Sequence, residues 1–488
     1  MSTGASGRGL RQSGRAAWLT LIARLHFYVG LFVGPFIFVA ALTGTIFVLT
    51  PQIEDHLYSE QLFADTVGEA QPLARQIEVA RAVVGEEPGL FAVRPASEAG
   101  RTTRVMFSEP GHGPSESRAI FVDPVSLAIR GDLMVYGTSS ILPFRTTLDY
   151  LHRNLLLGEF GRAYSELAAS WLWLLALGGL TIWLTAGVRN RADIAARSRR
   201  LRLRRRHGLI GLWVVLALVF FSATGLTWSK WAGDRIGVLR QQLGWVTPSV
   251  STALQPGLEV QAAPGHEGHE GHGDHAAHAD HEGHEGHGEH ADHMAAMSGM
   301  AAATATDALP SSRIDAVLAV ARQGGIDSSM LEIRPPRAEG YAWLVSEVDR
   351  SWPTQVDAVA VDPDTLSITS RADFASFPLV AKLIRWGIDA HMGILFGVAN
   401  QLLVAAFGLA ACTMLVLGYM MWWQRRPAPG APVHTLTAAW NNLPVLGRCL
   451  AVVVAVALGW SLPVMGLSLL AFVLVDVVRW RLTRHCHV

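Results

Sequence analysis

Long apolar runs bordered by arginine constrain this chain more than any other feature. Runs near residues 26–49, 167–188, 208–228 and 396–423 each reach the ~20 residues that a helix needs to cross a bilayer core. A longer run near 449–478 is interrupted by glycine and proline, which predicts a hairpin of two short spans. Because half of the 488 residues are hydrophobic and long polar segments separate the runs, we predict a multi-pass membrane protein with sizeable aqueous parts.

The arginines predict which segments lie in the cytoplasm. Nine of them fall within 189–206, and further arginines follow the fourth span and close the chain at Arg479, Arg481 and Arg484. Loops rich in Lys and Arg stay on the cytoplasmic side, so 51–166 and 229–395 are expected outside. The topology closes only if the last apolar run crosses twice, which favours six spans.

The chain repeats itself. His26 and His207 each open an apolar run, and a Thr-Gly pair follows both at the same offset, at Thr43 and at Thr224. Later in each repeat His152 and His391 precede a returning span with matching His-to-Gly spacing, shortly after an acidic residue. Repetition at this scale predicts a pseudo-symmetric membrane core, with the C-terminal hairpin as an appendage.

The two outer segments also resemble each other. In the first, a helical stretch at 73–84 precedes strand-like runs at 90–93, 103–107 and 119–123; in the second, a helix at 312–322 precedes runs at 331–334, 342–345 and 358–362. Short strands that end in Asp-Pro turns predict a small antiparallel sheet covered by one helix. We therefore expect one small α+β module in each repeat.

The predicted fold class is thus a membrane all-α bundle of four core spans with a C-terminal helical hairpin and two small periplasmic α+β modules. The expected boundaries are a cytoplasmic N-terminus at 1–24, span 1 at 25–50, module 1 at 51–166, span 2 at 167–188, an Arg-rich loop at 189–206, span 3 at 207–228, an outer segment at 229–395 that contains module 2 at 310–375, span 4 at 396–424, a cytoplasmic loop at 425–447, the hairpin at 448–479 and a cytoplasmic tail at 480–488.

The four repeat histidines are candidate haem ligands. His26 and His207 are expected at the cytoplasmic face and His152 and His391 at the outer face, so each pair would come from two different helices. Two neutral imidazoles from facing helices are what a b-type haem requires, and the pattern therefore predicts two such haems. For any single histidine, a hydrogen bond at the membrane interface is the simpler interpretation. The nearby glycines would admit a flat macrocycle, or serve only close helix packing.

The outer pair poses a problem of length. His152 and His391 lie more than thirty residues before the cytoplasmic arginines, which is ~45 Å of continuous helix. A bilayer core is only ~30 Å thick. Either these helices project above the membrane or they kink near Gly158, Gly161 and Gly397.

A histidine-rich tract at 265–300 contains no residues suited to a core, and we expect it to be disordered. Imidazole and carboxylate groups suit Zn²⁺, Ni²⁺ or Cu²⁺, and thioethers suit Cu⁺. The tract is predicted to collect metal, although a solvated linker is the alternative. The proposed ligands form two series, each with a residue at every third position: His266, His269, His272, His275, His278, His281, His284, His287, His290 and His293, then Met294, Met297 and Met300.

The ordered motifs resemble those of the PepSY-associated transmembrane proteins. The resemblance rests on the His-x-x-x-Gly-Leu span openings with a downstream Thr-Gly, the His-(x)5-Gly before the returning spans, and the two modules that end in Val-Asp-Pro. It covers most of residues 20–425. It implies a bacterial inner-membrane protein with PepSY-like modules in the periplasm, similar to haem-containing ferric-siderophore reductases.

By this resemblance His26, His152, His207 and His391 would hold haem, and electrons would cross the membrane to ferric siderophore or to Cu²⁺. No nicotinamide or flavin motif is present, so the donor would be a quinol or a separate cytoplasmic reductase. Two other functions stay open: a metal-binding or transport accessory protein that uses the histidine tract, and a PepSY-type interaction or inhibitor protein. Lipid and a metal or metal-siderophore substrate are the expected partners, and no basic patch suggests nucleic acid.

Overall fold

The computed structural model describes residues 14–113, 115–185, 199–255, 311–424 and 435–485. The predicted histidine tract at 265–300 lies outside the described residues. The chain divides into two compact units. The helical unit comprises Met1–Val48, Leu148–Ile236 and Gln401–Val488, and the sheet unit comprises Leu49–Thr147 and Gly237–Asn400.

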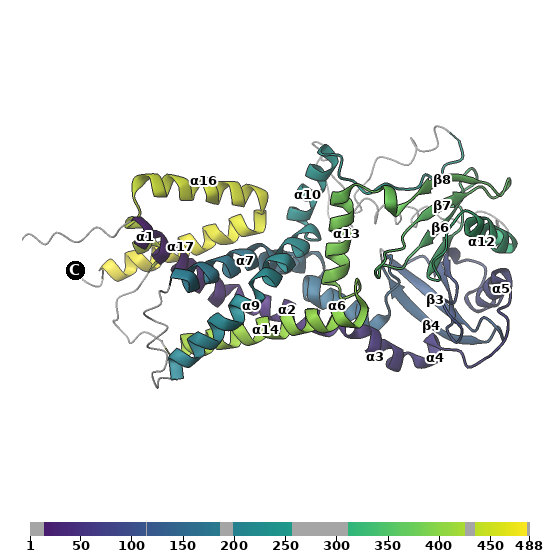
Figure 1. The fold of residues 1–488 in the computed structure, drawn as a ribbon, viewed down its shortest axis with the longest axis horizontal. Coiled ribbons are helices and arrows are strands. Elements are labelled where there is room, and N and C mark those ends of the chain that lie inside the picture. The colour runs from purple at the N-terminus through teal and green to yellow at the C-terminus, as the bar shows by residue number, and fades with distance from the viewer. Residues whose placement is uncertain (1–13, 114, 186–198, 256–310, 425–434, 486–488) are drawn as a thin grey trace, which may run out of the picture. The chain divides into compact units, whose positions relative to one another are not determined.

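Long apolar helices dominate the helical unit (Figure 1). Within the described residues, 4 helices are long and apolar enough to cross a membrane, and 5 spans result if the bent pair α1 and α2 counts as one. The sixth predicted crossing corresponds to the shorter apolar helix α16. The helices of this unit are α1 Gly14–Phe32, α2 Gly34–Val48, α7 Gly158–Thr185, α9 Arg199–Thr227, α14 Gly397–Trp423, α15 Leu436–Asn441, α16 Val445–Ser461 and α17 Pro463–His485.

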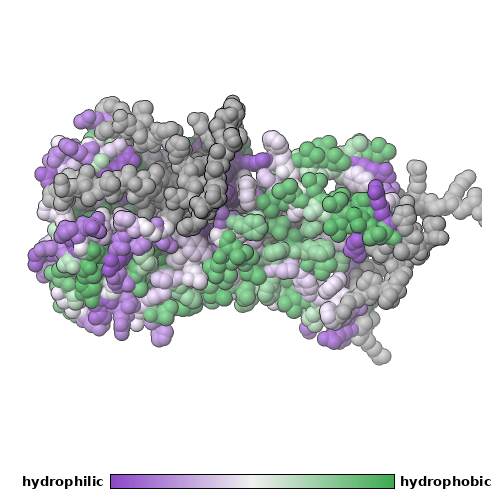
Figure 2. Space-filling view, turned by 180° about the vertical axis from the view of Figure 1, so that it is seen from behind, coloured by the Kyte–Doolittle hydropathy of each residue, from purple (hydrophilic) through white to green (hydrophobic). Residues whose placement is uncertain are grey.

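Apolar side chains fill the contacts between these helices. Ala176 of α7, Val215 of α9 and Ala411 of α14 belong to one buried cluster, and Trp171 of α7 joins Met465 of α17 in another. Many other apolar side chains of these helices are exposed. Figure 2 shows hydrophobic surface over this unit, whereas the surface of the sheet unit is largely hydrophilic. An outward apolar surface on long helices is suited to lipid.

The first span is broken at a proline. Helices α1 and α2 meet at Val33 with a bend of 60°. Pro35 has no N–H to donate to the carbonyl of Leu31, four residues earlier, so that carbonyl would be unpaired in the apolar interior. The hydroxyl of Tyr419 on α14 donates to it at 2.6 Å and satisfies it.

The C-terminal helices are fixed by a carboxylate. Helices α16 and α17 join at Leu462, within the break that the sequence predicts, and pack where Gly459 approaches Gly466. On α17 the buried Asp476 accepts hydrogen bonds from the backbone N–H groups of Leu436 and Thr437 at 2.9 and 2.7 Å. Asp476 therefore caps the N-terminus of α15.

One antiparallel sheet of eight strands forms the sheet unit, in the order β4-β3-β2-β1-β5-β6-β7-β8. Two four-stranded meanders meet at β1 and β5, where Val93 pairs with Ile333. The strands are β1 Gly89–Arg94, β2 Thr103–Ser108, β3 Glu116–Val122, β4 Ile129–Tyr136, β5 Leu331–Arg334, β6 Trp343–Glu347, β7 Ala358–Val361 and β8 Ile368–Ala372.

Alternating side chains of the sheet bury its two faces. In β2, Val105 and Phe107 join a core with helices α5 Leu73–Val84 and α12 Ile314–Gln323, whereas Met106 belongs to a core on the opposite face. The carboxylate of Asp315 on α12 accepts from the backbone N–H groups at the start of α5, at 2.8 and 3.1 Å. The two meanders therefore share one hydrophobic core and one capped helix pair.

The six predicted strand runs coincide with β1, β2, β3, β5, β6 and β7, and both predicted helices are present. The structure differs in two respects. Each meander has a fourth strand, β4 or β8, outside the predicted runs, although β4 contains an apolar run at 133–136. The expected separate modules also join into one sheet, since β1 and β5 pair edge to edge.

The remaining elements connect the sheet and the spans. The helices that carry His152 and His391 end before the returning spans begin, and new helices start at Gly158 and Gly397, both with φ of 58°. Of the two alternatives that the length predicts, the structure has the kink. These connecting elements are α3 Thr50–Leu57, α4 Ser59–Leu62, α6 Pro143–Asn154, α10 Trp231–Gln242, η3 Ser311–Arg313, η4 Phe374–Ser376 and α13 Leu379–His391.

Candidate functional site

Two predicted ligands face each other inside the helical unit. His26 lies on α1 and His207 on α9, and their imidazole rings have centroids 6.5 Å apart with planes at 87°. They are 181 positions apart in sequence (207 − 26), so only the packing of the helices brings them together. The pair is the one that the sequence assigns to the cytoplasmic face.

The hydrogen bonds of both rings define the same tautomer. Nδ1 of His26 lies 3.0 Å from the carbonyl oxygen of Leu175 on α7, and Nδ1 of His207 lies 2.9 Å from the carbonyl oxygen of Met414 on α14. A carbonyl only accepts, so Nδ1 carries the proton in each ring. Nε2 is then the nitrogen with a free lone pair, which is the arrangement typical of a metal-bound histidine.

The ring separation suits two axial ligands on one metal. For metal–nitrogen bonds of ~2 Å, imidazoles on opposite sides of an ion have ring centroids ~6.3 Å apart. Among the described residues, no cluster of three or more His, Cys, Asp or Glu side chains is arranged to hold a metal ion. A pair of imidazoles leaves four positions of an octahedral metal to other ligands, and a porphyrin supplies four nitrogens. Two imidazoles whose Nε2 atoms are free are the donor set that a haem would use.

Glycines lie against the imidazoles. A Cβ added to Gly179 of α7 would stand 3.0 Å from Cε1 of His26, and one added to Gly418 of α14 would stand 3.8 Å from Cε1 of His207. Neither Gly179 nor Gly418 is among the predicted site residues, although the pair Gly178 and Gly179 is a visible signal of close packing in an apolar helix.

His152 lies against the first span. Its Nδ1 is 3.1 Å from the hydroxyl oxygen of Thr43, and a Cβ on Gly44 would stand 3.3 Å from its Cε1. The Thr-Gly pair that the repeat marks is thus the surface on which this imidazole packs. Burial lowers the pKa of His152, so the ring is neutral at pH 7, as a metal ligand must be.

His391 ends α13 in the sheet unit, whereas His152 belongs to the helical unit. The side-chain amide of Asn400 donates to the carbonyl of the neighbouring Ala390 at 2.9 Å, which ties the end of α13 to the start of α14. The pairing of His152 with His391 stays a prediction.

Acidic residues precede both outer histidines and are paired with arginine. Asp149 contacts Arg153 at 3.1 Å, and the fully buried Asp389 pairs with Arg350 and lies 3.6 Å from Arg385. Burial raises the pKa of both carboxyl groups, and the arginines oppose that rise. The acids therefore hold the ends of α6 and α13 rather than forming a metal cluster.

Acidic residues also lie within apolar helices, where an ionisable group is a functional candidate by default. Glu166 on α7 is fully buried, and its Oε2 accepts from the backbone N–H groups of Trp231 and Ala232 at 3.0 and 3.3 Å, at the start of α10. Asp476 caps α15 in the same manner. Both acids are helix caps, and the sequence analysis assigned neither.

Comparison with protein-family models identifies the family of this chain. The family model described as PepSY-associated TM region matches residues 23–425, which include all four repeat histidines and both meanders. A search of curated proteins found no match.

Proposed function

Because the chain belongs to the PepSY-associated transmembrane family and is a multi-pass membrane protein, we propose that it is a haem-containing reductase. It would pass electrons across a bacterial inner membrane to an oxidised metal outside, Fe³⁺ in a siderophore complex or Cu²⁺. The observation that carries this proposal is the His26–His207 pair, whose rings are 6.5 Å apart with both Nδ1 atoms bound to carbonyls.

The residues of the site would hold haem in a fixed orientation. Leu175 and Met414 set the tautomer and direction of the two imidazoles through their carbonyl oxygens, and Gly179, with no side chain, leaves space for the ring of His26 in that orientation. Haem, when bound, supplies one-electron chemistry, and the protein sets its ligands and surroundings. His152 and His391 would be the ligands of a second b-type haem at the outer face.

The sheet unit would lie in the periplasm. Its two meanders each follow one helix, which supports their interpretation as two PepSY-like modules of an internal repeat. In this arrangement the repeated spans would carry electrons, the sheet unit would face the oxidised metal, and the histidine tract at 265–300 would collect metal ions.

An absorption spectrum of the purified full-length protein tests the proposal. We expect reduced α and Soret bands of b-type haem, with a pyridine haemochrome count near two per chain. His26→Ala and His207→Ala should each remove the same haem, about half of the total, because either variant would take away one of the two protein ligands that would hold it. The exposed His56 of α3 offers a matched control, and His56→Ala should retain both haems.

A colourless protein after expression with sufficient haem would refute the reductase. The accessory function would then be favoured, because it places the function in the histidine tract and needs no cofactor in the spans.

A further inference from the structure

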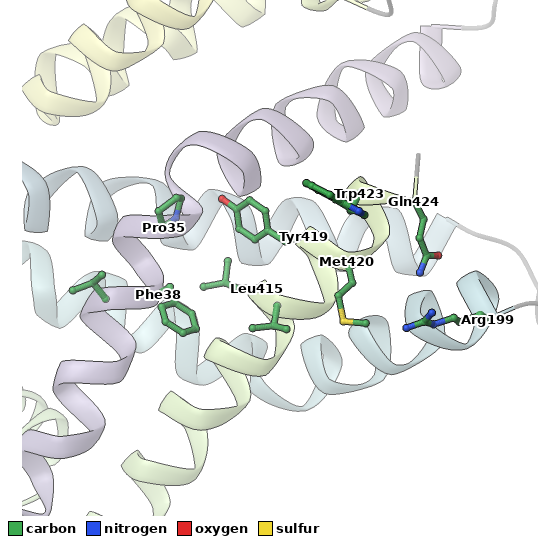
Figure 3. Close-up of a pocket in the computed structure, with 10 residues that line it drawn as sticks. Pro35, Phe38, Arg199, Leu415, Tyr419, Met420, Trp423 and Gln424 are labelled. Atoms are coloured by element: carbon green, nitrogen blue, oxygen red, sulfur yellow. The ribbon is translucent and has the colours of Figure 1, made fainter. Parts of the chain in front are cut away.

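A pocket of about 710 Å³ lies in the helical unit between α2, α14 and the start of α9. Figure 3 shows its lining: Phe38 and Leu415 at one end, and the side chains of Arg199 and Gln424 at the other. Val416 and Trp423 of α14 also line it and are 48% and 62% exposed on a candidate membrane span. The pocket therefore opens toward lipid.

One segment of α14, residues 414–419, contacts His207 and also lines the pocket. Met414 offers its carbonyl to His207 and Gly418 lies beneath the same ring, whereas their neighbours Leu415 and Tyr419 line the pocket. Tyr419 also bonds to Leu31 of α1, the helix that carries His26. The pocket and the site of His207 therefore share α14, and Tyr419 links the pocket wall to α1.

We propose that this pocket binds an isoprenoid quinol, the membrane-soluble electron donor of the reductase. A flat ring and an apolar tail suit the walls formed by Phe38, Tyr419 and Trp423, and the ring oxygens suit the N–H donors of Arg199 and Gln424. A phospholipid would also place its phosphate against Arg199, so competition between the two ligands decides the occupant. The inference rests on the proposed function.

The overall reaction balances. One quinol loses two electrons and two protons and becomes the quinone, and two oxidised metal ions outside each gain one electron. The donors at the Arg199 end lie at the start of α9, which the arginine pattern assigns to the cytoplasmic side, so the two protons would be released there.

Photolabelling of the full-length protein in lipid nanodiscs with a short-chain azido-ubiquinone tests the pocket without any measurement of activity. We expect label on peptides that contain 415–424 or 35–39, and we expect decylubiquinone to compete for it. Val416→Trp fills the pocket and should lower the labelling about tenfold. Leu409→Trp is the matched control, because Leu409 is 54% exposed on the same helix and does not line the pocket.

Arg199→Leu together with Gln424→Leu provides a second variant that removes the donors without filling space, and it should also weaken labelling. Label spread over many exposed apolar helices, or unchanged by these variants, would overturn the inference. So would a phospholipid that copurifies with the unaltered protein and is lost from Val416→Trp while decylubiquinone fails to compete. Haem without pocket labelling would refute only the quinol site, and pocket labelling without haem would refute only the reductase.

Discussion

At the residue scale, the histidines depend on atoms that a sequence motif does not contain. The carbonyls of Leu175 and Met414 hold the rings of His26 and His207, and any residue at positions 175 and 414 would present a carbonyl. Only helix packing decides which carbonyl lies near Nδ1. Beside the rings, residue identity therefore counts most at the glycines, where an added Cβ would contact an imidazole.

Replacement of Gly179 by Ala should loosen haem at this site. The new Cβ would stand 3.0 Å from Cε1 of His26 and would turn the ring. A ring turned by ~30° costs ~0.5–1.5 kcal/mol, so haem dissociation should rise about two- to tenfold by haem-transfer assay. Gly178→Ala is the control, because its Cβ has contacts of 3.6 and 3.8 Å, and an equal loss of haem in both variants would contradict the argument.

The hydrogen bond from Tyr419 to the carbonyl of Leu31 should stabilise the fold only because Pro35 leaves that carbonyl without its helical donor. Tyr419→Phe leaves the Leu31 carbonyl without its donor and should lower the free energy of unfolding by ~1–2 kcal/mol. In a Pro35→Ala background the restored N–H of residue 35 can serve that carbonyl, so the same replacement should cost less. Thermal unfolding of the four proteins of this double-mutant cycle measures the coupling, and additive losses would disprove it.

At the scale of elements, the two meanders of the sheet depend on one buried ion cluster. Strands β1 and β5 pair at Val93 and Ile333, and beside them Glu332 contacts Arg94 and Arg334 at 2.6 Å each. Burial alone would raise the pKa of Glu332, but the two guanidinium groups outweigh it and lower the pKa below its usual value. The carboxylate is therefore ionised where the meanders meet.

Glu332→Gln should weaken this junction in a pH-dependent manner. A depressed pKa contributes stability that is present above the pKa of the unfolded state and is lost as the pH falls through the folded value. The variant should therefore lose ~3 kcal/mol near neutral pH, and the difference should shrink in acid. Hydrogen exchange of the β1 and β5 backbone amides in the full chain, followed at neutral and at acid pH, measures the loss of stability and its dependence on pH.

The exposed pair of Arg75 and Glu78 supplies the comparison for that experiment. Both side chains are more than half exposed, so Glu78→Gln should change stability by less than ~1 kcal/mol. A Glu332→Gln protein that behaves like Glu78→Gln at every pH would show that the buried cluster does not hold the meanders together.

At the scale of the whole molecule, cofactor binding and metal collection should be separable. The proposed haem ligands lie on the membrane helices and on α6 and α13, whereas the candidate metal ligands at 265–300 fall in a tract with no core residues. Deletion of 265–300 should abolish the binding of added Cu²⁺ and Zn²⁺. It should leave the haem spectrum unchanged. Calorimetric titration with each ion and an absorption spectrum of the same preparation test both halves of this expectation.

The sequence by itself determined the element types. Apolar runs, arginine clusters and period-two strands depend on neighbouring residues, and they predicted the long membrane helices, the helix pairs and six of the eight strands. It also marked the histidines, because their repeat is visible in the chain. Strand β8 gave no such local signal, whereas the apolar run at 133–136 of β4 was a local signal that the prediction missed.

Tertiary structure alone decided which distant groups meet. The 6.5 Å approach of His26 and His207, the fusion of two meanders at β1 and β5, and the caps made by Glu166 and Asp476 all join residues that lie far apart in the chain. Each depends on how whole helices and strands pack, which short-range patterns do not encode. The tautomers of the two imidazoles follow from that packing.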